Sequence, residues 1–438
     1  RDDGASMLAP GYQWHLYKSI SLGWNIHKEK FMENVNWIES LKLRGGYGET
    51  SNASVPPYST ISTLTPNYYN FGTVSANGFY TQNIGNKALG WEYTNSFNAG
   101  IDFTLLKSRL SGSIDLYYMR TNGLLQNQLL PPTTGSLMPY LNNVGETQNK
   151  GFEIALKGVI VRNEKGFSWD IDANLFLNRS KIVSLYEGID KLEDNGWFVG
   201  QAIDVIYDYK KIGIWQLGEE TEAAVYGAYP GRVKIEDVDN NGVIDDKDKQ
   251  IVGNFEPDFE FGITNRLAYK GLDLTIITHG KVGGMLVSAI HQGQSYVNQM
   301  NGRRNGIKVN YWTEDNPTND FPGVRGNGDY PTFPSTFGYF SASYFKIRTI
   351  TLGYSVPAQW IKPLGINALR AYLTVDNVCT LFSPYVDKYG GLDPEPTAYG
   401  GQSFVNGYSY SMAKTGQLTI GPTVPPSRYF IFGLDIKF

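Results

Sequence analysis

Apolar and polar residues alternate with a period of two along much of the chain, a pattern typical of β-strands that have one apolar face. In residues 91–107, for example, Trp91 and Phe97 share one face with other apolar residues, whereas Asn98 and Asp102 lie on the opposite face. This segment is far longer than the strands of about 5–6 residues that are usual in soluble proteins. The pattern therefore predicts long strands that are apolar on one side and polar on the other.

The same alternation predicts about eleven strands along the chain. Their predicted ranges are 12–26, 37–50, 91–107, 109–127, 147–161, 166–183, 256–270, 271–284, 342–356, 367–380 and 427–438. An ionised side chain that faces lipid costs several kcal/mol, so we expect the apolar face of these strands to point outward into a membrane. The predicted fold class is all-β, a transmembrane antiparallel β-barrel.

The connections between the predicted strands alternate between short and long. The short ones are 107–108, 162–165 and 270–271, and the long ones are 51–90, 128–146, 184–255, 285–341 and 381–426. Outer-membrane barrels alternate in this way, with tight periplasmic turns and long extracellular loops. This alternation predicts that the last strand runs toward the periplasm and that residue 1 lies in an extracellular loop.

Counting strands by direction makes the first predicted strand the twelfth of about 22, the size of a plugged outer-membrane transporter. We therefore expect residues 1–438 to form the C-terminal half of the barrel, with the plug and the N-terminal strands outside this sequence. Half a barrel would leave two unpaired sheet edges in lipid, so the other half is expected in the functional protein.

Composition supports a barrel, because the chain has 49 Gly, 30 Tyr and 14% aromatic residues, and 18% of its residues are charged. Such a composition suits aromatic girdles and long polar loops. The net charge of −4, without a basic cluster, argues against a nucleic-acid partner. Cys379 is the single cysteine, and the four histidines are too scattered for a zinc motif. No apolar run is long enough for a transmembrane helix, and no nucleophile or phosphate-loop motif predicts an enzyme.

The sequence DVDNNGVIDDKD at 237–248 fits the spacing of a calcium-binding loop. Oxygen ligands at positions one, three, five, seven, nine and twelve suit a hard cation, and Gly242 allows the tight turn at position six. The predicted Ca²⁺ ligands are Asp237, Asp239, Asn241, Val243 through its carbonyl, Asp245 and Asp248. The ion would have a structural role in the extracellular loop 184–255. A plain acidic turn without an ion is the alternative.

Aromatic residues are frequent in the predicted long loops, where they could contact a sugar or peptide or simply pack the loops. They include Tyr58, Tyr68, Tyr69, Phe71, Tyr80, Trp215, Tyr226, Trp312, Phe333, Phe337, Tyr339, Tyr385, Tyr389 and Tyr399. No substrate-binding residue can be assigned from this distribution.

Several motifs resemble the SusC/RagA family of TonB-dependent outer-membrane transporters from Bacteroidetes. The matching segments are RDDGAS at the start of the chain, SISLGWNIHKEKF at 19–31, SLKLRGGYGETSN at 40–52, LGWEYT at 89–94, NVGETQNKGFE at 143–153, SYFKIRTITLGYSVP at 343–357 and FIFGLDIKF at the end. Gly46 and Ser51 depart from the family pattern, which usually has Ser and Gly there. Together the segments cover nearly the full length in the order expected for the family.

This resemblance implies import of oligosaccharides or peptides across the outer membrane. It also implies a SusD-like surface lipoprotein that acts as a lid, contact with TonB through the N-terminal part, and a complex in which two such pairs could dimerise. The alternative is a surface-exposed all-β glycan-binding or adhesive protein, which would have shorter strands and no apolar belt as wide as a lipid bilayer.

Overall fold

The computed structural model describes residues 1–438 except 129–130, 132, 134–139, 164–165, 293–307, 324–331, 396–417 and 421–425. Contacts between residues divide the chain into two compact units. The first comprises Arg1–Lys107, Ser113–Glu153 and Arg179–Ile203, and the second comprises Ser108–Gly112, Ile154–Asn178 and Asp204–Phe438.

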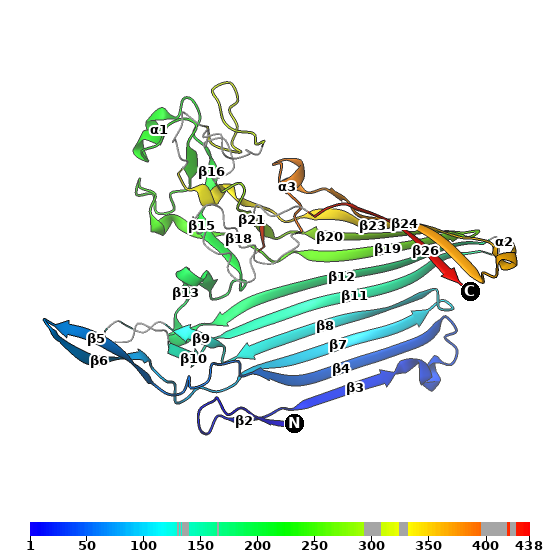
Figure 1. Cartoon of the computed structure of the whole chain (residues 1–438), viewed down its shortest axis with the longest axis horizontal. Coiled ribbons are helices and arrows are strands. Elements are labelled where there is room, and N and C mark those ends of the chain that lie inside the picture. Colours follow the sequence, from blue (N-terminus) through cyan, green and yellow to red (C-terminus); the bar gives the residue numbers. More distant parts are fainter. Residues whose placement is uncertain are drawn as a thin grey trace. The chain divides into compact units, whose positions relative to one another are not determined.

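The main element is an eleven-stranded sheet in which the order of the strands follows their order along the chain (Figure 1). Its strands are β3 (Ser19–Asn25), β4 (Ile38–Asn52), β7 (Glu92–Leu105), β8 (Leu110–Asn122), β11 (Glu146–Arg162), β12 (Phe167–Ser184), β19 (Phe259–Tyr269), β20 (Leu272–Val282), β23 (Tyr344–Ser355), β24 (Ala368–Leu381) and β26 (Tyr429–Lys437). Each predicted strand corresponds to one of these strands. The predicted all-β class with a large antiparallel sheet is therefore confirmed.

In the first unit, β4 pairs along its length with β7 and at its other edge with β3. The predicted strand 12–26 is wrong in extent, because β2 (Trp14–Leu16) pairs with β1 (Asp2–Gly4) instead of β4. The Tyr17 amide, which donates to the Arg1 carbonyl at 2.7 Å, continues that pairing. The start of the chain thus supplies a local partner that alternation alone does not reveal.

In the second unit, β19 and β20 form a hairpin whose register runs from Phe259 opposite Val282 to Tyr269 opposite Leu272. The two connecting residues, Lys270 and Gly271, both have positive φ, at 47° and 89°. This conformation matches the two-residue turn that best follows the twist of antiparallel strands. The short connection predicted at 270–271 is confirmed.

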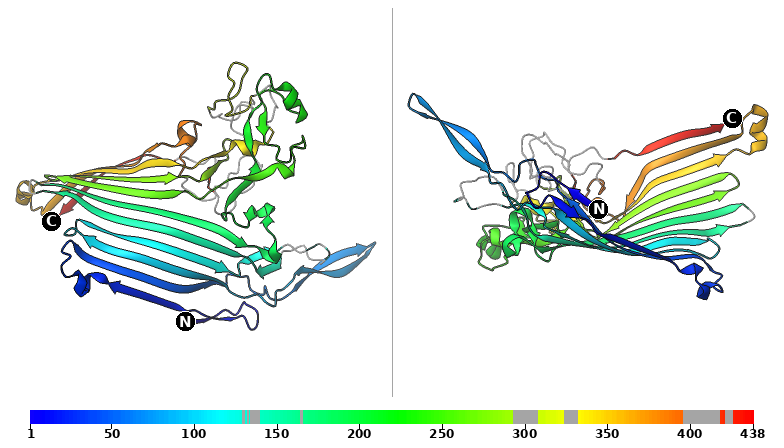
Figure 2. Two further views of the ribbon diagram at one scale, coloured as in Figure 1. Left: turned by 180° about the vertical axis from the view of Figure 1, so that it is seen from behind. Right: turned by 90° about the horizontal axis from the view of Figure 1, so that it is seen from below.

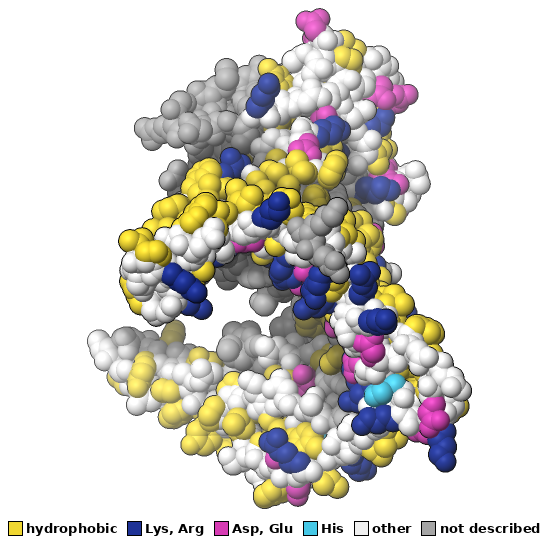
Figure 3. Space-filling view, turned by 90° about the vertical axis from the view of Figure 1, so that its right-hand side faces the viewer, with side chains coloured by type: hydrophobic (Ala, Val, Ile, Leu, Met, Phe, Trp, Pro, Cys, Tyr) yellow, Lys and Arg dark blue, Asp and Glu magenta, His cyan; other side chains and the backbone are white. Residues whose placement is uncertain are grey.

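Several ion pairs connect strands on the polar face of the sheet, and side chains of both charges are visible in the view of Figure 3. Arg44 on β4 donates to Asp102 on β7 at 3.0 Å and to Asp115 on β8 at 2.7 Å. Gly100 lies between them on β7, where a Cβ would come within 2.6 Å of Asp115 Oδ1. In the same way, Gly353 allows Arg370 on β24 to reach Asp273 on β20 at 2.6 Å. Glycine on the middle strand thus lets an ion pair reach across it.

The opposite parity exposes apolar side chains, as the alternation predicts. On β26, Phe430 and Phe432 are 69% and 70% exposed, and Leu434 and Ile436 continue the row. Soluble proteins rarely leave so many large apolar side chains open to water along one strand. A lipid-facing wall accounts for this pattern, because lipid covers the apolar residues.

The long connections contain small sheets and short helices. In the first unit these are the pairs β5 (Thr63–Phe71) with β6 (Val74–Asn83), β9 (Leu125–Gln128) with β10 (Tyr140–Asn143), and β13 (Lys191–Leu192) with β14 (Trp197–Phe198). In the second unit they are β15 (Val205–Tyr209) with β18 (Lys249–Asn254), β16 (Lys211–Ile214) with β17 (Val233–Ile235), and β22 (Tyr339–Ser341), β21 (Met285–Ser288) and β25 (Thr419–Ile420). The α-helices are α1 (Glu220–Val225), α2 (Ala358–Ile361) and α3 (Pro384–Asp387). No helix among the described residues is both long and apolar enough to cross a membrane.

Three long connections of the second unit share one hydrophobic core, which we call the loop core. Its buried members are Ile214, Val233, Ile235, Leu286, Trp312, Phe321, Phe337, Phe340, Ala342, Tyr385 and Ile420. Ala342 lies at the start of the predicted strand 342–356, and the other members come from 184–255, 285–341 and 381–426, which the sequence predicts only as long loops. These connections therefore pack into a folded body of their own.

Candidate functional site

The candidate site lies in the segment 204–255, where two strand pairs hold an acidic turn beside a pocket. The pairs are β15 with β18 and β16 with β17. Val233 and Ile235 of β17 are buried in the loop core, so the intervening Lys234 lies on the other side of that strand. The acidic turn 237–248 connects β17 to β18. Because β17 pairs with β16 and β18 pairs with β15, both ends of the turn are held in place.

Backbone amides surround the carboxylates of the acidic turn. The Asp237 carboxylate accepts from the Gly242 amide at 2.9 Å and from the Asn241 amide at 3.2 Å. The Asn241 side-chain oxygen accepts from the Val243 amide at 2.7 Å. Gly242 has a φ of 81°, which a non-glycine residue rarely adopts, so the turn requires glycine there. These bonds lower the pKa of Asp237 below its ordinary value, although burial alone would raise it.

Asp248 closes the other end of the turn. It is fully buried, and its two oxygens accept from the Val238 amide at 2.8 Å and from the Asp245 amide at 2.7 Å. Asp245 in turn accepts from the Lys247 amide at 2.8 Å and caps the short 3₁₀ turn Asp246–Asp248. The two ends of the turn are thus joined through Asp248.

The structure brings together the carboxylate oxygens of Asp237, Asp239 and Asp248, which all lie within 4.8 Å of one another. Asp245 is outside this group, because its carboxylate caps the 3₁₀ turn. Three carboxylates this close repel one another unless a cation lies between them. The oxygens suit a hard cation such as Ca²⁺, with the Asn241 side chain and the Val243 carbonyl nearby in the chain. The donor set therefore fits the ion that the motif predicts.

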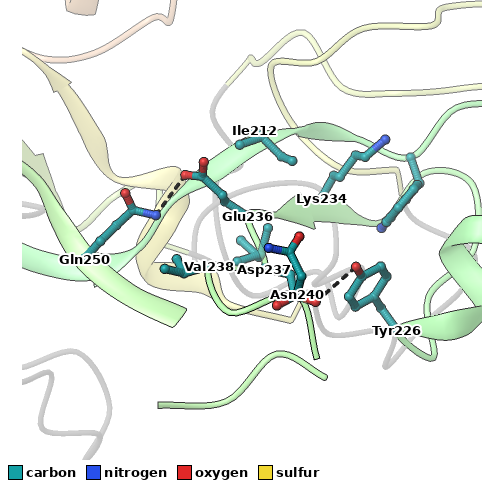
Figure 4. Close-up of a pocket in the computed structure, with 10 residues that line it drawn as sticks. Ile212, Tyr226, Lys234, Glu236, Asp237, Val238, Asn240 and Gln250 are labelled. Carbon is teal, nitrogen blue, oxygen red and sulfur yellow. Dashed lines mark hydrogen bonds between the residues drawn. The ribbon is translucent and has the colours of Figure 1, made fainter. Parts of the chain in front are cut away.

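A pocket of about 460 Å³ adjoins the acidic turn (Figure 4). Asp237, Val238 and Asn240 line it from the turn, and Lys234 and Glu236 line it from β17 and the residue beyond. The remaining lining residues are Ile212, Trp215, Tyr226, Ile235 and Gln250. The pocket and the turn share Asp237, whose Oδ2 accepts from the Tyr226 hydroxyl at 3.2 Å.

Two of the three charged residues that line the pocket form ion pairs. Lys234 pairs with Glu219 at 2.9 Å, and its ammonium lies 4.1 Å from the centre of the Trp215 ring. Glu236 pairs with Lys210 at 2.9 Å and accepts from Gln250 at 2.8 Å. The third charged residue, Asp237, accepts hydrogen bonds from the Tyr226 hydroxyl and from backbone amides and has no ion pair among the described residues, so the lining carries one unbalanced negative charge. Aromatic, amide and carboxylate groups of this kind can bind either a sugar or a peptide backbone.

A buried polar network was missed by the sequence analysis. His291 is fully buried; its Nδ1 lies 2.7 Å from Ser288 Oγ, and its Nε2 lies 3.0 Å from the Tyr389 carbonyl. The Tyr385 hydroxyl lies 2.9 Å from the same Ser288 oxygen. The serine and histidine resemble a nucleophile and base by distance, but both are completely buried and both ring nitrogens are engaged. The network holds the segment after β21 against α3. Its members are too far apart in the sequence to form a local motif.

A second missed cluster joins the sheet to the segment that follows α3. Lys346 on β23 is 3% exposed and donates to Asp393 at 2.7 Å and Glu395 at 3.2 Å. Glu395 also pairs with Arg348 and accepts from the Tyr344 hydroxyl at 3.4 Å. A buried lysine with paired carboxylates fixes its partners strongly, because an unpaired buried charge is costly. The cluster therefore fastens the segment 393–395 to β23.

The aromatic residues predicted in the long loops divide into two groups. Trp312, Phe337 and Tyr385 are buried in the loop core, and Trp215 is buried against Tyr226 and Lys234. The aromatic residues of 51–90 are exposed instead. Tyr399 lies outside the described residues. Packing thus accounts for the first group, whereas the exposed group lies outside the hydrophobic cores formed by the described residues.

Residues 5–274 match the protein family described as TonB dependent receptor-like, beta-barrel. Over its whole length the chain is 30% identical to TonB-dependent receptor P3 of Formosa agariphila and 28% identical to TonB-dependent receptor SusC of Bacteroides thetaiotaomicron. The matched parts are 43% and 41% of these relatives. The chain therefore spans less than half the length of the curated relatives it matches.

Solved structures show the same fold. The RagAB peptide transporter superposes with a TM-score of 0.75 at 24% identity, covering 100% of this chain and 45% of that chain. The RagAB peptide importer in its open-open state gives a TM-score of 0.76 at 23% identity, covering 99% of this chain and 44% of that one. At this level of identity the likeness concerns the fold.

Proposed function

Because this chain belongs to the TonB-dependent receptor-like β-barrel family, whose members lie in the bacterial outer membrane, we propose that it forms one part of the wall and outer loops of a SusC/RagA-type importer. The single observation that carries the proposal is the eleven-stranded antiparallel sheet, whose strands follow one another in chain order. The proposed cargo is an oligosaccharide or a peptide.

The two faces of the sheet support this function. Exposed apolar side chains on one face suit contact with lipid, and ion pairs such as Arg44 with Asp102 suit a polar interior. The alternative of an adhesive or glycan-binding surface protein predicts shorter strands. Strands such as β12, with 18 residues, and β11, with 17, favour the transporter.

We propose three partners for the complete importer. A SusD-like surface lipoprotein would cover the outer loops as a lid, TonB would act through the part of the protein that this chain does not contain, and two such pairs could assemble as a dimer. The packed loop core supports the first of these, since it offers a rigid outer body on which a lid could rest.

We also propose that Ca²⁺ binds at 237–248. The ligands would be Asp237, Asp239, Asn241, Val243 through its carbonyl, and Asp248, with Asp245 at position nine acting through a water molecule. The ion would offset the repulsion among the grouped carboxylates and stiffen the connection from β17 to β18. It has no proposed role in transport chemistry.

The function is tested by uptake in cells that carry or lack the complete gene. Labelled peptide and oligosaccharide pools are offered separately, with and without functional TonB. The proposal expects uptake of one pool to require both the gene and TonB. Surface binding that persists without TonB-dependent uptake would instead support an adhesive or glycan-binding protein, and uptake of both pools regardless of the gene would contradict the proposal.

A further inference from the structure

The hairpin formed by β5 and β6 is unusual in its lack of charge. No Asp, Glu, Lys, Arg or His occurs between Glu49 and Lys87, a stretch that contains the whole hairpin. In both views of Figure 2 the hairpin extends away from the ends of β4 and β7, which belong to the same unit. Surface loops of a protein with 18% charged residues would normally carry several charges, so this neutrality needs a physical reason.

Large apolar side chains are exposed on both faces of the hairpin. The register places Tyr69 and Phe71 on one face with Tyr80, and Tyr68 on the other with Phe79. Tyr68, Phe71 and Phe79 are 68%, 68% and 69% exposed. A two-stranded hairpin alone is marginally stable in water, and exposed large apolar side chains gathered on one hairpin usually mark an interaction site.

The two edges of the hairpin differ. On β5, Pro66 has no amide hydrogen, and proline within a sheet is found at edges that do not accept another strand. On β6, the sequence from Val74 to Asn83 contains no proline and no charge. Proteins normally protect such an edge with lysine, proline or a bulge. On β6 the register shifts only beside Gln82, near the end of the strand, and Val74–Thr81 pairs with β5 without interruption. Among the described residues, β6 pairs with no strand other than β5, so its outward backbone groups make no further strand pairing there.

We propose that the outer edge of β6 pairs with an extended strand of a second protein at the outer surface, one whose contacting residues are uncharged and largely apolar. A β-strand is the occupant that the observations favour, because it alone offers amide and carbonyl groups at the spacing of the β6 backbone. A sugar chain or a lipid could cover the aromatic rings but could not form hydrogen bonds with successive amide and carbonyl groups along the β6 edge. The added strand would also extend both apolar faces.

This interface goes beyond the proposed function. It depends on that function in one respect only, which is that the hairpin lies outside the cell. It is tested in the complete transporter, isolated from outer membranes after a photo-cross-linking amino acid has replaced Asn77 on β6. The same group at Val225 on α1, which is 63% exposed, serves as the matched control. The interface predicts a cross-link from position 77, but not from 225, to an uncharged strand-forming segment of another polypeptide.

Charge at the edge provides the second arm. Ser75→Lys combined with Thr81→Lys places cations on β6 beside position 77, whereas Ser75→Gln with Thr81→Gln adds similar length without charge. An unpaired charge against an apolar strand is costly, so we expect the lysine pair to reduce the cross-link about tenfold or more and the glutamine pair to leave it largely unchanged.

Several results would overturn the interface. These are a cross-link that stays within the transporter chain, one to a saccharide or lipid, no cross-link at all, or one that the lysine pair does not reduce. Heat-modifiable gel migration and TonB-dependent uptake, measured on the same samples, report separately on the barrel and its function. If position 77 gives no cross-link in the protein without the lysine pair while the barrel and its uptake are intact, the interface alone is refuted.

Discussion

Replacing Phe321 with alanine should loosen the loop core without unfolding the sheet. The Phe321 side chain is 1% exposed, and its ring centre lies 5.7 Å from that of His291 and 6.2 Å from that of Tyr389. The ammonium of Lys211 lies 5.7 Å from the same ring. Truncating a fully buried phenylalanine to alanine costs about 3–5 kcal/mol. Because these partners all belong to the long connections, the loss should fall on the loop core.

The assay is limited proteolysis of the complete transporter in detergent, with cleavage sites mapped in 205–255 and 309–323. If cleavage requires local opening, a loss of about 3 kcal/mol in the stability of the loop core raises the cleavage rate about a hundredfold. Ile212→Ala is the matched control, because Ile212 is 50% exposed and should leave the rate nearly unchanged. An unchanged rate in Phe321→Ala would refute the loop core as the source of order in these connections. Loss of heat-modifiable migration would show that the core is not separate from the sheet.

Three further predictions concern other parts of the chain. Removing Ca²⁺ with a chelator should speed proteolytic cleavage within 237–248 at least several-fold, because the ion stabilises the turn. The Asp237→Asn variant should be cleaved at the fast rate whether or not Ca²⁺ is present. Equal cleavage rates of the unmodified protein with and without the chelator would count against the site. Gly353→Ala should lower the unfolding temperature of the barrel through a loss of about 1 kcal/mol, because its Cβ would displace the guanidinium of Arg370 and the carboxylate of Asp273 from their ion pair, whereas Gly48→Ala, with its nearest atom at 4.0 Å, should be tolerated. Burial lowers the pKa of Lys211 from 10.5 to about 8, so its buried charge destabilises the loop core at neutral pH, and this cost should decline as pH rises from 8 to 10.5. Lys211→Met should therefore resist proteolysis better at pH 7 and lose that advantage near pH 10.5; a pH-independent difference would contradict this.

The long strands could be predicted because their signal is local. In β7 the apolar residues Phe97, Ile101 and Phe103 are separated by two or four positions, so the sequence alone places them on one face of a strand. The acidic turn could be predicted for a similar reason, since its residues lie within one short motif. The role of Asp245 could not, because the spacing does not reveal that its carboxylate caps the 3₁₀ turn.

The loop core and the hairpin could not be predicted from such patterns. Ser288 and Tyr385 meet in the loop core although they are 97 residues apart, and no periodicity connects them. The hairpin lacks alternation because β5 and β6 have apolar and uncharged polar residues on both faces, so the pattern does not distinguish it from a loop. For the loop core, the sequence pattern does not show which residues far apart in the chain pack together. For the hairpin, it does not show which partner covers the exposed side chains.

The central claim is that this chain forms the wall of an outer-membrane barrel whose long connections lie outside the cell. It is tested by labelling single cysteines in intact cells with a membrane-impermeant maleimide, after Cys379→Ser removes the native thiol. Lys247→Cys in the acidic turn should label in intact cells, and Lys270→Cys in the β19–β20 turn should label only after the outer membrane is permeabilised. Labelling of Lys270→Cys in intact cells, or protection of Lys247→Cys until permeabilisation, would contradict the account.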